Sequence, residues 1–166
     1  MKTKTQKIVT AALLASLVCV ATMIIKIPSP LKGYLNLGDC VVLLCGWILS
    51  PLYGFLAAGI GSALADLFAG YAVYVPATFA IKGAMAVIAY YAFRLLNNKV
   101  GSLPARISGG IVAEVVMILG YFVFEGFLYG FVASAVNIPA NAVQGLAGLI
   151  LGIALVRIFE KNKILQ

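Results

Sequence analysis

Four ionisable side chains interrupt long apolar stretches of this sequence, namely Asp66, Lys82, Glu114 and Glu125. A charged side chain near the centre of a lipid bilayer costs about 2.5–3.5 kcal/mol on insertion scales, so a residue of this kind usually has a function. Asp66 and Lys82 both fall near the outer end of a predicted membrane span, where they could form an ion pair. Such a pair would either hold two helices together or contact a ligand.

Polar side chains form a helical stripe on each of the last two apolar stretches. The first stripe consists of Glu114, Ile118, Tyr121 and Glu125, and the second of Asn137, Asn141, Gln144 and Gly148. Residues at the spacing i, i+4, i+7, i+11 lie on one face of a helix. Because lipid offers polar groups no hydrogen-bond partner, both stripes should face the interior of a helix bundle.

Several of these side chains should meet at one depth in the outer half of the membrane. They are Lys82, Tyr121, Asn141 and Gln144, with Glu114 nearer the middle. Donors, acceptors and an aromatic ring that converge under an outer loop suit a small, planar, polar heterocycle. The alternative is that they only bridge helices, as Asn and Gln do in model peptides with about 1–2 kcal/mol. The convergence favours a ligand site.

The sequence lacks the residues that several other kinds of chemistry require. It contains no histidine, which excludes histidine acid–base catalysis and histidine metal ligation. The three cysteines, Cys19, Cys40 and Cys45, are too few and too irregularly spaced for a metal cluster or a disulfide framework. We expect them to be small apolar packing residues. No nucleophile–base pair or glycine-rich phosphate loop is visible. We therefore expect no enzymatic activity, no cofactor and no metal.

The composition places this chain in a membrane. Of its 166 residues 63% are hydrophobic and only 10% are charged, whereas soluble domains are about 45–50% apolar and about 25% charged. The net charge of +7 would suggest nucleic acid in a soluble protein. Here the basic residues lie in short segments between apolar stretches, which indicates membrane topology.

Six spans account for the pattern of charges. We predict an all-α integral membrane protein, a six-transmembrane-helix bundle with both termini cytoplasmic, in one membrane domain over residues 1–166. The spans are expected at residues 8–25, 39–50, 52–69, 76–93, 107–128 and 138–158, with an inner connection at 94–106 and outer connections at 26–39 and 129–137. This arrangement puts nine of the twelve basic residues inside, with Lys26 and Lys32 outside. The second span, about 18 Å long, must be short, extend backwards into the first loop or be shielded by its neighbours.

Small residues on two spans allow close helix packing. Ala57, Gly61 and Ala65 recur every four residues, and Ala11 and Ala15 repeat the pattern on the first span. Such faces bring helix backbones together. They serve either packing within this chain or docking of another membrane subunit.

The chain resembles a known family over nearly its whole length. The residues that carry the resemblance are Ala11 and Ala15, Tyr-Leu-Asn-Leu-Gly-Asp at 34–39, the run 59–71, Ile-Lys-Gly at 81–83, Ala113 with Glu114, Met117, Gly120 with Tyr121, and the segment 141–145. In these it resembles the substrate-binding S components of energy-coupling factor (ECF) vitamin transporters. It looks nearest to the branch for pyridoxine-like or hydroxymethylpyrimidine-like compounds.

The resemblance implies a binding subunit without enzymatic activity in a prokaryotic cell membrane. It implies an outward-facing pocket capped by the first outer loop, and docking through Ala11 and Ala15 onto a membrane coupling subunit with two ATPase subunits. Pyridoxine (vitamin B6) or hydroxymethylpyrimidine is the expected ligand, with riboflavin or another B vitamin as the alternative. The expected site residues are Tyr34, Asn36, Lys82, Glu114, Tyr121, Asn141 and Gln144. The rival functions are a structural or assembly membrane protein and a self-standing small-solute transporter.

Overall fold

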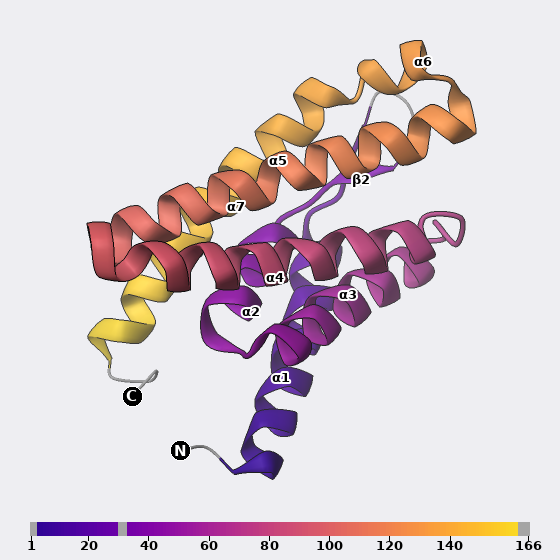
Figure 1. The fold of residues 1–166 in the computed structure, drawn as a ribbon. Helices are drawn as coiled ribbons and strands as arrows, with labels where there is room; N and C mark the ends of the chain where they lie inside the picture. The colour runs from indigo at the N-terminus through magenta and orange to yellow at the C-terminus, as the bar shows by residue number, and fades with distance from the viewer. Residues whose placement is uncertain (1–2, 30–32, 163–166) are drawn as a thin grey trace.

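The computed structural model describes residues 3–29 and 33–162, which are mostly helical (Figure 1). The helices are α1 (Lys4–Ile24), α2 (Gly38–Ile48), α3 (Pro51–Phe68), α4 (Val75–Val100), α5 (Ser102–Tyr129), α6 (Phe131–Ala135) and α7 (Ile138–Lys161). Two short antiparallel strands, β1 (Ile27–Pro28) and β2 (Tyr34–Leu35), form a hairpin in the first loop. Lys2, Lys32 and Lys163, which were assigned to the two sides of the membrane, lie outside the described residues.

Five helical segments in the described part of the chain are long and apolar enough to cross a membrane. They are α1, α3, α4, α5 and the continuous segment Phe131–Lys161. The helix α2 is apolar but has only 11 residues. The structure therefore supports a membrane helix bundle, and the count of six spans stays a prediction.

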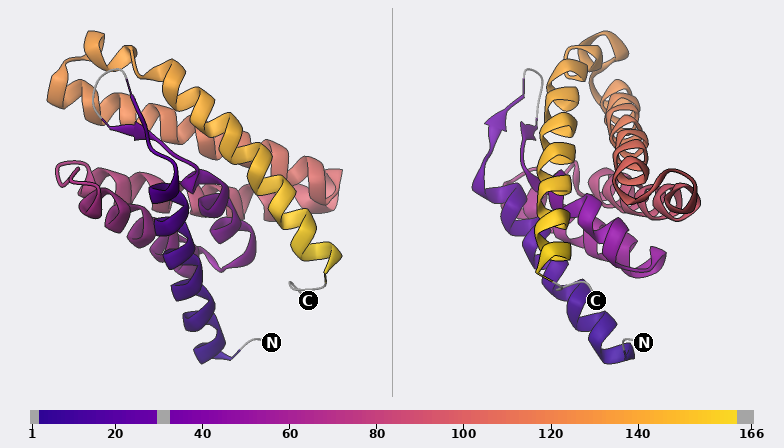
Figure 2. Two further views of the ribbon diagram at one scale, coloured as in Figure 1. Left: turned by 180° about the vertical axis from the view of Figure 1, so that it is seen from behind. Right: turned by 90° about the vertical axis from the view of Figure 1, so that its left-hand side faces the viewer.

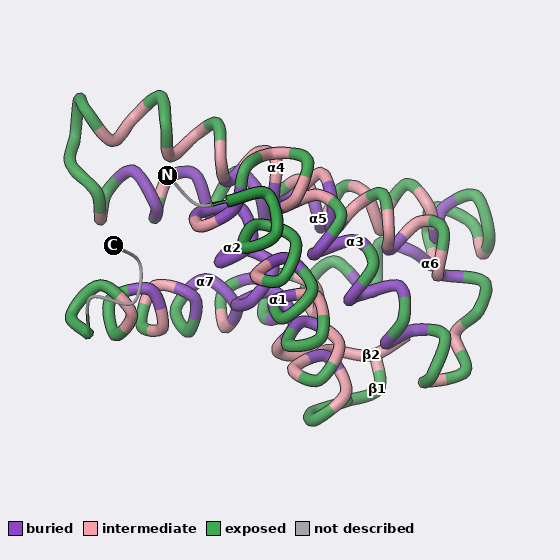
Figure 3. Tube along the Cα trace, turned by 90° about the horizontal axis from the view of Figure 1, so that it is seen from below, coloured by how far each residue is buried: buried purple, intermediate pink, exposed green. Residues whose placement is uncertain are grey.

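The short helix α2 lies at the centre of the bundle. It packs against α1, α3, α4 and α7, and Val42, Leu43 and Leu44 have no exposed surface. Figure 3 shows α2 as a buried element, whereas the first turns of α1 are exposed. Because neighbouring helices surround α2 and shield it from lipid, this helix does not have to be as long as the bilayer is thick.

The connections contain more regular structure than expected. The segment 94–106 was expected to be a connection, but α4 continues to Val100 and α5 begins at Ser102, with Gly101 at a φ of 86° as the turn. Polar residues such as Arg94 and Lys99 end the apolar stretch but are good helix formers. The expected outer connection 129–137 contains the one-turn helix α6. Hydropathy locates the apolar part of a helix and not its ends.

The hairpin and α6 lie at one end of the bundle, and both termini lie toward the other (Figure 1). Figure 2 shows the hairpin extending from the C-terminal end of α1 into the space between the α3–α4 pair and the α5–α7 pair. The turn between α3 and α4 lies at the same end as the hairpin. The first loop, the α3–α4 turn and the segment between α5 and α7 thus meet there.

Candidate ligand-binding site

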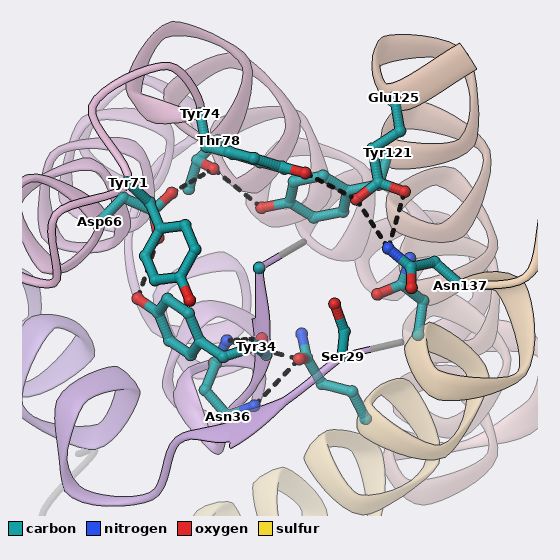
Figure 4. Close-up of a pocket in the computed structure, with 13 residues that line it drawn as sticks. Ser29, Tyr34, Asn36, Asp66, Tyr71, Tyr74, Thr78, Tyr121, Glu125 and Asn137 are labelled. Atoms are coloured by element: carbon teal, nitrogen blue, oxygen red, sulfur yellow. Dashed lines mark hydrogen bonds between the residues drawn. The ribbon is translucent and has the colours of Figure 1, made fainter. Parts of the chain in front are cut away.

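A pocket lies beneath the hairpin at this end of the bundle (Figure 4). Its lining comes from the first loop, α3, the α3–α4 turn, α4, α5 and the start of α7, and comprises Ser29, Gly33, Tyr34, Asn36, Asp66, Tyr71, Tyr74, Thr78, Tyr121, Glu125, Asn137, Asn141 and Gln144. Five of the seven expected site residues are among them, namely Tyr34, Asn36, Tyr121, Asn141 and Gln144. The two stripes on α5 and α7 therefore do turn toward each other.

One wall of the pocket is organised around Asp66. The Tyr34 hydroxyl donates to Asp66 Oδ1 (2.9 Å), and the Thr78 hydroxyl donates to Asp66 Oδ2 (2.5 Å). The Tyr121 hydroxyl lies 3.0 Å from Thr78 Oγ1. Burial and the neighbouring Asp66 carboxylate raise the pKa of the Tyr34 hydroxyl well above its usual range, so this group stays protonated. A hydrogen-bonded chain thus runs from the first loop through α3 and α4 to α5.

The opposite wall is organised around Glu125. The Asn137 amide nitrogen donates to both carboxylate oxygens at 3.0 Å, and the Tyr74 hydroxyl donates to Oε1 at 3.2 Å. Glu125 is only 3% exposed although it lies close to the end of α5. These bonds join α5 to the starts of α4 and α7.

An ion pair lies behind the pocket, and its partners differ from the expected ones. Lys82 pairs with Asp39 at the start of α2, and both side chains are buried. The expected pair of Lys82 with Asp66 is wrong, because Asp66 is held by Tyr34 and Thr78 instead. The central position of α2 brings Asp39 to Lys82. Lys82 Nζ also lies 5.5 Å from the centre of the Tyr121 ring, so Lys82 supports the pocket without lining it.

Gln144 connects the ion pair to the first loop. Its Nε2 donates to Asp39 Oδ2 (2.7 Å), and its Oε1 accepts from the backbone N–H of Asn36 (3.0 Å). Together with the Tyr34–Asp66 hydrogen bond, this contact holds the hairpin against the bundle.

The pocket beneath the hairpin has little free space. The volume open to the centres of water-sized molecules is about 40 Å³, which is enough for about two waters. The hairpin therefore stands closed over the pocket.

Glu114 lies outside the pocket lining. Its side chain is buried next to Gly145, and neither carboxylate oxygen has a hydrogen-bond partner among the described residues. A Cβ added to Gly145 would lie 3.1 Å from Glu114 Cβ, so this glycine provides the space that Glu114 occupies. Glu114 belongs to the interior behind the pocket.

The expected site residues leave out seven of the twelve polar side chains of the lining. Asp66 and Glu125 were recognised as unusual charges, but Thr78, Tyr74 and Tyr71 were not singled out. Tyr71 and Tyr74 belong to the α3–α4 turn, where no helical stripe marks them. Their rings pack edge to face at 6.2 Å, and the Tyr71 ring lies 5.1 Å from that of Tyr34. An aromatic cluster between two apolar stretches was the available signal.

The expected docking residues lie on a groove between α1 and α3. Ala11 and Ala15 line it, together with Leu56, Ile60 and other apolar residues. A Cβ on Gly61 of α3 would collide with the carbonyl oxygen of Ala15. The small residues therefore already serve close packing within this chain, while the groove beside them stays open.

The groups that line the site are those of a binding pocket. Within residues 3–29 and 33–162, no group of three or more His, Cys, Asp or Glu side chains is placed to hold a metal ion. The arrangement offers hydroxyls, amides, carboxylates and aromatic rings around a small enclosed space. Such a lining suits reversible binding of a small polar molecule.

A family model and a solved structure that match this chain describe the same class of membrane protein. A family model described as the S component of ECF-type riboflavin transporters matches residues 2–161. A solved structure, described as the S component of a bacterial ECF transporter, has a TM-score of 0.78 at 27% identity and covers 96% of this chain and 98% of its own. An uncharacterized protein of Pyrococcus woesei is 37% identical over 146 residues, which are 87% of this chain and 95% of the relative.

Proposed function

Because this chain belongs to the S-component family of ECF transporters, we propose that the pocket beneath its first loop captures a small water-soluble vitamin or vitamin precursor. A protein of this family is the substrate-binding subunit of a transporter, and its ATPase partners are separate. The observation that carries the proposal is the convergence of polar side chains from four helices, the first loop and the α3–α4 turn on a single pocket.

The small free volume of the closed pocket favours a ligand with one ring over a larger one. The closed pocket has little free space, so opening the hairpin must create the room for a ligand. A pyridoxine-like or hydroxymethylpyrimidine-like molecule needs the smaller opening. Riboflavin, the vitamin in the description of the matching family model, needs room for three fused rings and is the alternative ligand.

Each expected site residue has a place in this proposal. Tyr121 stacks on the ring of the ligand, and Asn141 and Gln144 bind its ring nitrogens and hydroxyls. Tyr34 and Asn36 close the site from the hairpin. Lys82 and Glu114 act from behind the lining, where they orient Gln144 and Tyr121 or reach polar groups of a deeply bound ligand.

The orientation proposed for the chain follows from its charges. Lys4, Lys7, Lys99, Arg106 and Arg157 lie toward the end that holds the two termini. An excess of basic residues marks the cytoplasmic side. We place both termini there, count α2 as a sixth and shielded span, and treat residues 1–166 as one domain in a prokaryotic plasma membrane. The pocket then faces outward.

The groove between α1 and α3 is the proposed contact with the membrane coupling subunit of an ECF module, which also carries two ATPase subunits. Ala15→Leu should fill the groove and prevent close helix approach. We expect ligand binding by the isolated protein to survive, whereas ATP-driven uptake by the assembled transporter falls at least about tenfold. Vesicle uptake and calorimetry measure the two effects.

The matched control for this substitution is Ala154→Leu, which adds the same bulk at an exposed position on α7. It should leave both binding and uptake unchanged. Loss of binding together with uptake in Ala15→Leu would assign this face to internal packing, as the contact between Ala15 and Gly61 also allows.

A thermal-shift screen of the purified protein tests the proposed function. B vitamins and their precursors are added at micromolar concentration, and stabilisation by at least one of them is expected, since a ligand that binds only the folded state raises its stability. If none stabilises the protein, the polar side chains only hold helices together, as in an assembly protein. Uptake without any ATPase partner would instead indicate a self-standing transporter.

A further inference from the structure

We infer that the pocket selects a cationic ligand, such as a heterocycle with a protonated amine or a quaternary nitrogen, over a neutral ligand of the same shape. The inference rests on the proposed function and specifies the class of its substrate. Its basis is an excess of buried acidic over buried basic side chains around the pocket, in a chain whose net charge is +7.

Acidic side chains are concentrated at the pocket end of the molecule. Four of the five acidic residues of the sequence are buried in or behind the pocket, namely Asp39, Asp66, Glu114 and Glu125. Among the described residues, Lys82 is the only buried basic side chain at this end. Even with Glu114 counted as a neutral acid, three carboxylates face one lysine.

Among the described residues, no basic side chain forms an ion pair with Asp66 or Glu125. The charge of Lys82 is taken up by its ion pair with Asp39. Lys26, the other described basic residue of the first loop, is exposed, with its Nζ 6.0 Å from the centre of the Tyr34 ring, and water screens its charge. In the part of the chain that the structure describes, the two carboxylates of the pocket walls therefore have only neutral hydrogen-bond donors.

The hydrogen bonds of Glu125 fit a charged carboxylate. Both of its oxygens accept from the amide nitrogen of Asn137, which can donate but cannot accept. A proton on Glu125 would displace one of these bonds. Neutral donors reduce the penalty of burying a carboxylate, but only a counter-charge removes its field.

The arrangement of aromatic rings in the lining also suits a cation. Figure 4 shows Asp66 and Glu125 on opposite sides of the pocket, with tyrosine rings between and beside them. The four tyrosines of the lining are Tyr34, Tyr71, Tyr74 and Tyr121. Aromatic rings attract a cation above their faces, and groups of such rings recognise ammonium ligands. An anionic ligand, such as a phosphorylated vitamin, would meet repulsion from both walls.

Calorimetric titration of the full-length protein with two pairs of matched probes tests the inference. One pair is pyridoxamine and pyridoxine, and the other is the 5-aminomethyl and 5-hydroxymethyl forms of 4-amino-2-methylpyrimidine. Each pair differs in one group, a protonated amine or a neutral hydroxyl, on the same ring. Riboflavin serves as a neutral probe with a larger ring system. We expect at least one amine to bind about tenfold or more tightly than its hydroxyl partner.

Variants that remove one charge show whether the carboxylates cause the preference. Asp66→Asn and Glu125→Gln keep the shape of the side chains. Each should lower the ratio of the amine's affinity to that of its hydroxyl partner by a factor of about three or more. The control is Glu160→Gln, which removes the same charge at the other end, where Glu160 pairs with Arg106. It should leave the ratio unchanged.

The outcomes separate this inference from the proposed function. If a hydroxyl probe or riboflavin binds as tightly as the amines, the inference is overturned and the capture of a vitamin stands. If none of the five probes binds, the inference is overturned, and the thermal-shift screen of the other B vitamins and precursors decides whether the proposed function falls with it. Because the wild-type protein alone gives the ratio of affinities, the test does not depend on the folding of any variant.

Discussion

Replacing Lys82 with methionine is expected to lower the free energy of unfolding by about 3–5 kcal/mol, because the substitution leaves a buried carboxylate without its counter-charge. Asp39 has no exposed surface, and Lys82 is only 3% exposed. The remaining hydrogen bond from Gln144 to Asp39 Oδ2 is donated by a neutral amide, which does not neutralise the carboxylate. Unfolding of the purified protein in detergent measures the loss.

A double variant identifies the cause of this loss. Adding Asp39→Asn to Lys82→Met removes the uncompensated charge, so the double variant should be more stable than Lys82→Met alone. Lys161→Met, at an exposed position near the end of α7, should unfold like the wild-type protein. If Lys82→Met alone unfolded like the wild type, the ion pair would have no structural importance.

A leucine in place of Gly46 is expected to destabilise the protein by about 3 kcal/mol, because α2 and α4 are in backbone contact there. A Cβ on Gly46 would collide with the carbonyl oxygen of Ala86 and lie 2.9 Å from Ala89 Cβ. Separation of the two helices would also move Asp39 of α2 away from Lys82 of α4.

The measurement for this variant is again unfolding in detergent. Ala154→Leu, which adds a side chain at an exposed position, should have almost no effect. Wild-type stability of Gly46→Leu would contradict the central position of α2 in the bundle.

The helical stripes were the most informative part of the sequence. Tyr121, Asn141 and Gln144 lie on the inner faces of α5 and α7 and line one pocket, because polar groups at helical spacing cannot face lipid. Spacing along one helix does not give its rotation or depth relative to another helix. The partner of Lys82 could therefore not be predicted from the sequence, since it depends on how α2 enters the bundle.

Most of the features that could not be predicted from the sequence lie in loops. The β1–β2 hairpin has two residues in each strand, too few for a period of two to be visible. Tyr71 and Tyr74 reach the pocket through the turn after Gly70, whose φ is 85°. Such a turn is set by local backbone geometry. Apolar runs located the helices, whereas the capping loop and the aromatic cluster required the structure.

Calorimetric titration of the wild-type protein and two pocket variants tests the central claim most directly. The probe is the vitamin or precursor that gives the largest stabilisation in the screen. The wild type should bind one molecule per chain, and Asn141→Ala should weaken binding ten- to a hundredfold, or about 1–3 kcal/mol, by leaving a buried group of the ligand without a partner. No side-chain hydrogen bond in the described structure depends on Asn141, so its loss should not disturb the fold.

Gln144→Ala should weaken binding by a similar factor and also release the hairpin, which Gln144 holds through the backbone N–H of Asn36. Asn98→Ala, at an exposed position on α4 far from the pocket, is the control and should bind like the wild type. The account predicts weaker binding in both pocket variants and unchanged binding in the control. Wild-type affinity in both Asn141→Ala and Gln144→Ala would contradict it and place the binding site elsewhere.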